Sequence, residues 1–530
     1  MTARRLATIR AALVAILAAG LLAGCGDSSS PNPNDATTLT VLAGSEVKDL
    51  VPLLPAIKAA TGVDLVLTYS GTLEGAEAIA GGANTDVAWF SSGNYLSLLP
   101  GAGSRVVAQQ QIMLSPVVIG VKKSVADKFG WTNNPNVTWK DIEAKSADGS
   151  FKFAMTNPAA SNSGLVALIG VASALSGSSD SIDTGTIDKT ALRAFFKGQA
   201  LTAGSSGFLA DSYVRDQDTV DGIVNYESIL MSLNAGGKLH EPLSLIYPKE
   251  GIVTADYPFM LLNKAKRDSY DKVVAYLRTP DVQKRIMTDT LRRPAIPGVA
   301  LDPRFTAQTL IELPFPAKLD TIDALITAYL DEVRRPASAV FVLDVSGSMA
   351  GDRLDQLKAA MNALTGTDPT LTGKFARFRA HEQVTIVTFA SQVEEVREFT
   401  IDDTAPTGPD MTAIRNYVNG LQTYDGTAIY SGLEQAYKTV GEAQATDPNR
   451  LFSVVLMTDG ENNAGVSPDG FANDFAGLAG PVRAVHTYTV LFGGGNKDAM
   501  TSIATLTGGT LFDATTTALE TIFKQIRGYQ

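Results

Sequence analysis

Ala339-Val-Phe-Val-Leu-Asp-Val-Ser-Gly-Ser348 joins an apolar run to three side chains that carry oxygen. The apolar residues 339–343 predict a short buried strand. Asp344, Ser346 and Ser348 then follow at every second position, where an extended chain directs side chains to the same side. Open α/β sheets bind ligands at the carboxyl ends of their strands, so this stretch predicts an α/β fold with a ligand site at the sheet edge.

Two further segments place oxygen atoms at equivalent positions. Val454-Val-Leu-Met-Thr-Asp459 is a second apolar strand that ends on an aspartate, and Asp425-Gly-Thr427 precedes a predicted helix. Carboxylate and hydroxyl oxygens are hard ligands that suit Mg²⁺ or Mn²⁺ and not zinc. For the two hydroxyls at helix starts, the alternative is a helix cap without a metal. The candidate metal ligands are Asp344, Ser346, Ser348, Thr427 and Asp459.

Residues 336–530 resemble the von Willebrand factor A domain, and the five candidate ligands match its metal-ion-dependent adhesion site one by one. The resemblance implies a doubly wound, Rossmann-like fold. It also implies that the two serines and the threonine coordinate the ion, while the two aspartates bind it directly or through water. An acidic residue of a partner would then take the sixth position, so we expect a protein or polymer partner that offers an acidic group.

Residues 37–335 alternate short strands with helices. Strand character is clear in Leu39-Thr-Val-Leu-Ala43, in 63–69 and in Asp86-Val-Ala-Trp-Phe90, and helical apolar spacing lies between them. A strand–helix–strand rhythm predicts right-handed crossovers and a parallel sheet. This part of the chain is therefore expected to be a second α/β unit.

The same region resembles bacterial extracellular solute-binding proteins, the two-lobed periplasmic-binding-protein-like (type 2) class that closes on a ligand. Small polar residues at predicted strand ends and helix starts carry the resemblance, together with the segment Asn225-Tyr226-Glu227-Ser228. Helix starts with nearby hydroxyls favour anions, and the resemblance is closest to binders of molybdate, sulfate or phosphate. Each cluster alone is also typical of a helix cap or turn, and a cleft that has lost its solute is a further alternative. The candidate solute-binding residues are Ser45, Ser70, Thr72, Ser161, Ser163 and Tyr226.

The amino-terminal residues are typical of an export signal. Arg4, Arg5 and Arg10 precede a short apolar run, and Leu22-Ala-Gly-Cys25 follows it. This motif resembles a bacterial lipobox, which implies cleavage before Cys25 and lipid attachment there. A plain secretory signal with an incidental cysteine is the alternative. Cys25 is the only cysteine, so no intramolecular disulfide can form.

A domain boundary is predicted near Arg334-Arg335-Pro336. Proline ends the helix predicted over 321–333, and a new strand pattern starts just after it. We therefore divide the chain into four parts: 1–24, a lipoprotein signal peptide; 25–36, a lipidated tether rich in Ser, Pro, Asn and Asp; 37–335, the solute-binding-like domain; and 336–530, the von Willebrand factor A-like domain.

Composition excludes some functions. A chain of 530 residues is too long for one core, and its formal charge of −11, without a basic block, argues against nucleic-acid binding. The only histidines are His240, His381 and His486, and all lie far from the motifs in the sequence. No general base can be placed beside the candidate metal ligands, so we expect no enzyme activity.

We expect a lipoprotein anchored to the cell membrane on its extracytoplasmic face. It would bind its partner through the divalent metal, while a solute-binding-like domain remains available for a small solute. The alternative is a substrate-binding receptor of an ABC-type transporter for an oxyanion or other small solute, with an accessory von Willebrand factor A domain.

Overall fold

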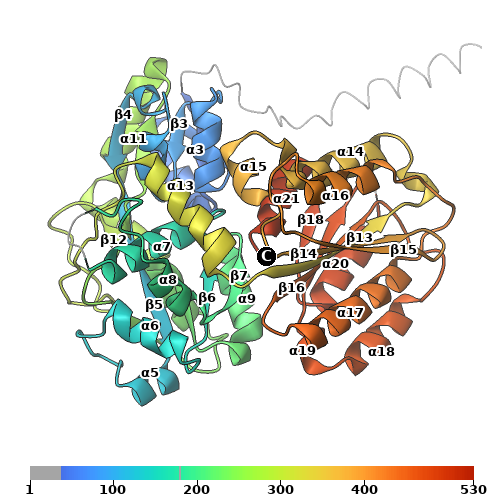
Figure 1. Ribbon diagram of the computed structural model, residues 1–530. Coiled ribbons are helices and arrows are strands. Elements are labelled where there is room, and N and C mark those ends of the chain that lie inside the picture. Colours follow the sequence, from blue (N-terminus) through green and yellow to red (C-terminus); the bar gives the residue numbers. More distant parts are fainter. Residues whose placement is uncertain (1–36, 178–180, 494) are drawn as a thin grey trace, which may run out of the picture.

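The computed structural model describes residues 37–530 except 178–180 and 494 (Figure 1). The expected signal peptide (1–24), the tether (25–36) and the lipidation site Cys25 lie outside the described residues. Within the described part, none of the helices combines the length and apolar character needed to cross a bilayer.

The first lobe is built on a sheet with the strand order β2-β1-β3-β11-β4. The strands are β1 (Thr38–Ala43), β2 (Asp64–Tyr69), β3 (Val87–Trp89), β4 (Ala108–Gln111) and β11 (Pro258–Leu261). The helices of this lobe are η1 (Ser45–Leu53), α2 (Leu54–Thr61), α3 (Thr72–Ala80), α4 (Asn94–Leu98), α11 (Arg267–Leu277) and α12 (Pro280–Thr290). Strand β1 pairs in parallel with β2 and β3, as expected, whereas β11 runs antiparallel to both β3 and β4.

The second lobe is built around the long strand β5 (Met113–Lys122), in a sheet with the order β10-β5-β8-β6-β7. The other strands are β6 (Phe153–Thr156), β7 (Gln199–Ala203), β8 (Gly222–Tyr226), β9 (Leu243–Ile246), β10 (Thr254–Ala255) and β12 (Arg293–Pro294). The helices are α5 (Lys123–Phe129), α6 (Trp139–Ala147), α7 (Asn162–Leu175), α8 (Lys189–Phe196), α9 (Ser206–Asp216) and α10 (Glu227–Ala235). Strand β5 is antiparallel to β8, β9, β10 and β12.

The predicted parallel pairing is confirmed for β1, β2 and β3, the strands from which it was inferred, whereas later antiparallel strands make both lobes mixed sheets. The crossover rule applies to strands joined by a helix within one sheet. Here the chain passes between the lobes at β4–β5 and again at β10–β11, so β5 and β11 enter their sheets in the opposite direction.

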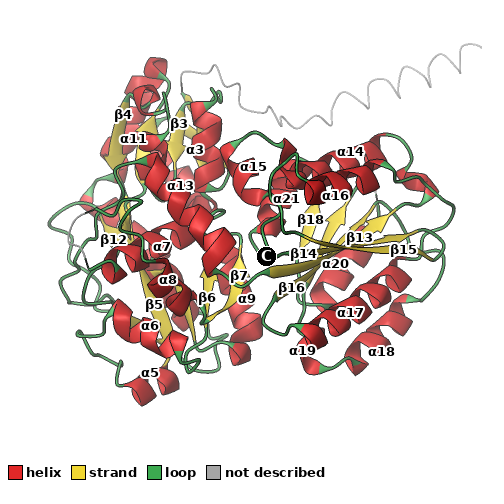
Figure 2. Cartoon of the chain, viewed as in Figure 1, coloured by secondary structure: helices red, strands yellow, loops and turns green. Residues whose placement is uncertain are grey.

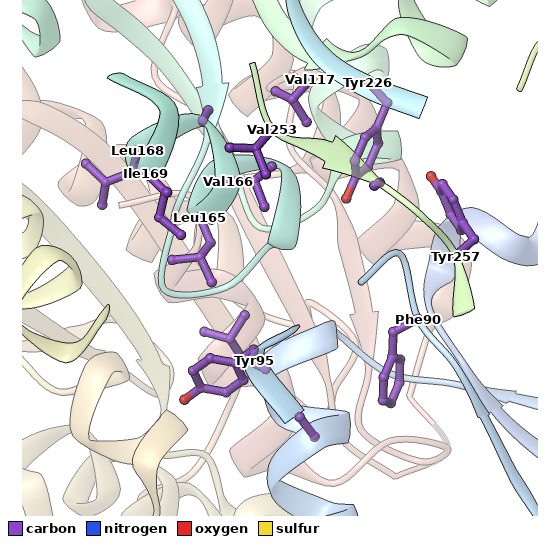
Figure 3. Close-up of a cluster of buried hydrophobic side chains, with 14 of the residues drawn as sticks. Phe90, Tyr95, Val117, Leu165, Val166, Leu168, Ile169, Tyr226, Val253 and Tyr257 are labelled. Atoms are coloured by element: carbon purple, nitrogen blue, oxygen red, sulfur yellow. The ribbon is translucent and has the colours of Figure 1, made fainter. Parts of the chain in front are cut away.

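The two lobes pack directly against each other. One apolar cluster contains Phe90 and Tyr95 of the first lobe together with Leu165 of α7 in the second lobe (Figure 3). Figure 3 also shows Tyr226 beside Tyr257, and their ring centroids are 6.2 Å apart. Helix α13 (Leu319–Ala328) and the following π-helical turn η5 (Tyr329–Val333) add apolar residues to the same cluster, so the predicted helix over 321–333 belongs to this core.

The C-terminal domain is a six-stranded sheet with the order β15-β14-β13-β16-β17-β18. Its strands are β13 (Ala337–Asp344), β14 (Gln383–Phe389), β15 (Val393–Thr400), β16 (Leu451–Thr458), β17 (Thr487–Leu491) and β18 (Leu511–Asp513). All neighbours pair in parallel except β15, the antiparallel edge strand.

Helices cover both faces of this sheet (Figure 2). Alternate residues of the central strand β13 pack on the two faces of the sheet. Phe341 belongs to one apolar cluster, whereas Val340 and Val342 belong to another. The first cluster involves α14 (Asp352–Asn362), α16 (Pro409–Asn419) and α21 (Leu519–Arg527). The second involves α17 (Ile429–Thr446), α18 (Pro468–Gly477) and α20 (Lys497–Leu506), and the short helices α15 (Leu371–Ala376) and α19 (Gly480–Arg483) complete the domain.

Candidate functional site

The predicted metal ligands lie where the strand order of the C-terminal sheet reverses. Counted in chain order, the strands of this sheet run 3-2-1-4-5-6, and β13 and β16 are the neighbouring strands 1 and 4. Asp344 is the last residue of β13, and Asp459 directly follows β16. Doubly wound sheets form their binding crevice at this switch point, because the loops leave the two strands in opposite directions.

Hydrogen bonds connect four of the five predicted ligands. The backbone N–H of Ser346 donates to Asp344 Oδ1 at 2.7 Å. The hydroxyls of Ser346 and Ser348 lie 3.0 Å apart, and Ser348 Oγ donates to Asp459 Oδ1 at 2.8 Å. Two carboxylates and two hydroxyls from different strands therefore converge within one small region.

Thr427 reaches the same region from a third loop. The loop turns at Gly426, whose φ of +78° is one that residues with a side chain rarely adopt. A Cβ atom on Gly460 would lie 3.4 Å from Thr427 Cγ2 and 3.8 Å from Asp344 Oδ2, so both side chains face one hollow. The structure thus brings all five predicted residues together.

Three neighbours of the site escaped prediction. Thr458 Oγ1 donates to Asp344 Oδ2 at 2.5 Å, and the side chain of Asn463 accepts the backbone N–H of Thr427 at 2.8 Å. Arg353, in the first turn of α14, forms an ion pair with Asp459 and also donates to the carbonyl of Ser348 at 3.1 Å. Its guanidinium group is a fixed positive charge beside one carboxylate of the site.

The donor set fits a small hard cation. Asp344 is fully buried, and burial raises the pKa of its carboxyl group, with the charge of Asp459 adding to the increase. A divalent ion would offset both negative charges, whereas the hydroxyls add oxygen ligands without charge. Among the described residues, no group of three or more His, Cys, Asp or Glu side chains is placed to hold a metal ion, so a site here depends on its hydroxyls. The binding of Mg²⁺ or Mn²⁺ stays a prediction.

A cavity of about 300 Å³ is lined by residues of both lobes and of the C-terminal domain. Two of the predicted solute-binding residues, Ser45 and Ser70, line it from the first lobe. Asn157 and Ser205 line it from the second lobe. Polar groups of both lobes therefore face one space, which is where a two-lobed solute binder holds its ligand.

The other predicted solute-binding residues do not line this cavity and lie in hydrogen-bonded networks. Ser163 Oγ lies 2.7 Å from Ser206 Oγ and 3.1 Å from Ser161 Oγ, all within the second lobe. Thr72 Oγ1 lies 3.4 Å from Ser91 Oγ in the first lobe. These buried hydroxyls have hydroxyl partners in the protein, and no side chain caps the start of α3 or of α7.

Tyr226 bridges the two lobes directly. Its hydroxyl oxygen lies 3.0 Å from Ser91 Oγ and 3.3 Å from Glu46 Oε1, and it accepts a hydrogen bond from the side-chain amide of Asn162. Burial raises the pKa of Tyr226, and the charge of Glu46 adds to that increase. Burial also raises the pKa of Glu46.

Comparison with protein families assigns both halves of the chain. The model for the bacterial extracellular solute-binding protein matches residues 39–289, and the model for the von Willebrand factor type A domain matches residues 339–461. The chain therefore carries an extracellular solute-binding domain followed by a C-terminal von Willebrand factor A domain. The predicted fold class, a periplasmic-binding-protein-like unit followed by a doubly wound domain, is confirmed.

Two curated relatives each match about a quarter of the chain. Inter-alpha-trypsin inhibitor heavy chain H2 of Sus scrofa is 28% identical over 133 residues, which are 24% of this chain and 13% of that protein. The magnesium-chelatase 60 kDa subunit of Rhodobacter capsulatus is 28% identical over 134 residues, 25% of this chain and 20% of that protein. The chain thus spans a fifth or less of the length of these two relatives.

Solved structures are similar to each half. The sulfate-binding protein SubI from Mycobacterium tuberculosis has 20% identity and a TM-score of 0.40, over 55% of this chain and 96% of that one. The periplasmic binding protein AfuA from Actinobacillus pleuropneumoniae has 13% identity and a TM-score of 0.42, over 56% and 98%. A von Willebrand factor type A protein from Catenulispora acidiphila has 18% identity and a TM-score of 0.29, over 37% and 43%.

Proposed function

We propose that this chain is a membrane-anchored binding protein that works outside the cytoplasm. Its von Willebrand factor A domain holds one Mg²⁺ or Mn²⁺ ion and, through it, an acidic group of a protein or polymer partner. The extracellular solute-binding domain beside it takes a small solute. Lipid attachment at Cys25 is part of the proposal, and so is the absence of enzyme activity.

Support for the metal half comes from the convergence of three loops at one sheet edge. Asp344 and Asp459 supply the negative charge, and Ser346, Ser348 and Thr427 supply neutral oxygen atoms. When bound, a divalent ion with this protein environment keeps an open position that attracts a carboxylate. In this proposal the ion takes its ligands from hydroxyl oxygens as well as from the two carboxylates.

A second candidate is favoured by the cavity that both lobes line together with the C-terminal domain. Ser45, Ser70, Asn157 and Ser205 present polar groups to it from both lobes. In this alternative, the chain is the substrate-binding receptor of an ABC-type transporter and the C-terminal domain is an accessory. This alternative would be favoured if the chain bound a solute tightly and captured its partner equally well with and without divalent ions.

A capture experiment tests the metal half. The full chain is immobilised and exposed to solubilised membranes, with Mg²⁺ or with EDTA. We expect a partner that is retained only with Mg²⁺ and is released by a soluble polyglutamate competitor. Thr427→Ala should lose that partner because it removes a neutral ligand while leaving the charge of the site unchanged. As a matched control, Thr288→Ala replaces an exposed threonine on α12 and should retain it.

Capture that is equal in Mg²⁺ and EDTA would contradict the proposal. So would Mg²⁺-dependent capture that survives Thr427→Ala, since the ion would then act somewhere else.

A further inference from the structure

The cavity in front of the two lobes has a third wall, which comes from the von Willebrand factor A domain. Lys524 and Tyr529, at the C-terminal end of the chain, line the cavity opposite Ser45 and Ser205. Figure 1 shows helix α15 of the C-terminal domain beside α3 of the first lobe, with the chain end between the domains. The C-terminal domain therefore covers the opening of the solute-binding domain.

The C-terminal domain is bound to the first lobe by specific polar contacts. The carboxylate of Glu77 on α3 accepts the backbone N–H groups of Leu371 and Thr372 at 2.6 and 3.0 Å, as well as the Thr372 hydroxyl at 2.8 Å. Glu74 of the same helix accepts a hydrogen bond from Thr521 of α21 at 3.2 Å. Two carboxylates of one helix thus fix α15 and α21 against this lobe.

The same domain contacts the second lobe through its last residues. The side-chain amide of Asn157 donates to the carbonyl of Arg527 at 3.3 Å, and the rings of Phe208 and Tyr529 are 6.2 Å apart. A Cβ atom on Gly528 would lie 2.4 Å from the Cα atom of Gly204, so the two backbones meet with no room for a side chain. One domain therefore touches both lobes across the cavity opening.

The size of the cavity argues against a bare inorganic anion. In this measure of volume one water needs about 10–15 Å³, so 300 Å³ has room for on the order of twenty waters. A tetrahedral oxyanion of about five bonded non-hydrogen atoms would leave most of that space unfilled. Sites for small organic molecules begin at about this volume.

Positive charge dominates the cavity walls. Glu74 is the one carboxylate among the lining residues, and it is engaged by the hydroxyls of Ser70 and Thr521. Lys524 approaches from the C-terminal domain, where its Nζ lies 3.0 Å from Asp368 and donates to the hydroxyls of Thr370 and Thr372, so an anion would bind it in exchange for one of these contacts. Lys48 approaches from the first lobe, and in the described part of the chain no carboxylate oxygen lies within ion-pair distance of it. A ligand with a negative group suits these walls best.

Aromatic rings supply the rest of the surface. Tyr69 of the first lobe and Phe208 of the second belong to the small group of exposed large hydrophobic side chains. Both line the cavity, as do Phe375 and Tyr529 of the C-terminal domain. Exposed rings on opposite walls favour a ligand with a carbon skeleton that they can contact.

We propose that the solute site of this chain is a three-walled chamber, completed by its von Willebrand factor A domain, and that it binds an organic anion of roughly ten or more non-hydrogen atoms. Lys48 and Lys524 bind the negative group from opposite walls, and the rings of both lobes contact the carbon skeleton. The inference rests on the solute-binding half of the proposed function and is independent of the metal half.

Calorimetric titration of the full chain tests this proposal. The organic anions are glucose 6-phosphate, citrate and 4-hydroxybenzoate, with glucose as a neutral solute and sulfate as an inorganic oxyanion. We expect at least one of the organic anions to bind at least tenfold more tightly than glucose and sulfate. Lys524→Gln should weaken that binding about tenfold, whereas Lys284→Gln, an exposed lysine on α12, should leave it unchanged.

Hydrogen exchange gives an independent measurement that does not need a variant. The bound anion should slow exchange in α3, α9 and α21 together, since all three elements border the chamber. The proposal is overturned if none of the three organic anions binds, if sulfate or glucose binds as tightly, or if protection stops at the two lobes. Asp344→Ala should keep anion binding, so a failure of the metal site and a failure of the chamber give different results.

Discussion

Replacing Glu382 with alanine will lower the free energy of unfolding by about 3–5 kcal/mol, because it leaves buried guanidinium groups without their carboxylate. Glu382 lies just before β14 and is 2% exposed. Its carboxylate pairs with Arg334, 3% exposed, and with Arg527, 5% exposed, whose Nη2 lies 2.8 Å from Oε2. A buried charged group without a counter-charge is costly, and this substitution leaves two such groups, the guanidinium groups of Arg334 and Arg527.

The effect should reach both domains. Arg334 follows the helical segment that packs in the core of the lobes, and Arg527 ends the last helix of the C-terminal domain. Urea-induced unfolding of the full chain measures the loss. Glu398→Ala, on the exposed edge strand β15, is the matched control and should change stability by less than about 0.5 kcal/mol. A loss of that small size for Glu382→Ala would contradict the account of this cluster.

The same cluster predicts a pH dependence. Burial alone would raise the pKa of Glu382, but Arg527 and Arg334 outweigh it and hold the pKa below the ordinary value of 4.5. A carboxyl group with a lower pKa in the folded state stabilises the fold fully above its unfolded pKa, and that contribution is lost as the pH falls through the folded value. As the pH falls below 4.5, the wild type should therefore lose the part of its stability that comes from Glu382. The Glu382→Ala variant should not show this part of the loss.

Replacing Glu227 with alanine is expected to have the second largest effect, again about 3–5 kcal/mol. Its carboxylate is fully buried at the start of α10 and accepts two hydrogen bonds of 2.7 Å from the guanidinium group of Arg293. The hydroxyl of Tyr247 donates to it at 2.5 Å. Alanine would leave Arg293, which is 12% exposed, without a counter-charge.

Thermal unfolding of the full chain gives the measurement, with Asp268→Ala on α11 as an exposed acidic control in the same domain. Glu227→Gln should lose less than the alanine variant, since an amide keeps one acceptor for Tyr247 or Arg293. Equal stability of the wild type and Glu227→Ala would show that this network does not stabilise the solute-binding domain.

The predicted metal site could be found from the sequence because its signals are local. Asp344 and Asp459 each follow an apolar run that ends at the sheet edge, and both strands are central ones. Parallel pairing of adjacent strands then brings their carboxyl ends together without further information. Arg353 gave no such signal, because a charged residue in the first turn of an exposed helix is ordinary in sequence.

Other features depend on how distant segments dock. Strand β15 has five exposed residues in succession, so it lacks the alternation that identifies a half-buried strand. The antiparallel strands β5 and β11 result from the passage of the chain between lobes, which no local pattern encodes. Lys524 and Tyr529 line the solute cavity only because the C-terminal domain covers it. The folds of the two domains could be predicted from the sequence, whereas the chamber that they share could not.

The most direct test of the central claim is a calorimetric titration of Mg²⁺ into the full chain. The chain is first dialysed against EDTA to remove bound metal, and the EDTA is then removed. The account predicts one ion per chain, with binding lost in Asp344→Ala and unchanged in the control Asp268→Ala. At an Mg²⁺ concentration one hundred times the Kd, the ion should stabilise the wild type by about 2.7 kcal/mol and leave Asp344→Ala unaffected. Binding that is absent in the wild type, or equal in Asp344→Ala, would contradict the account.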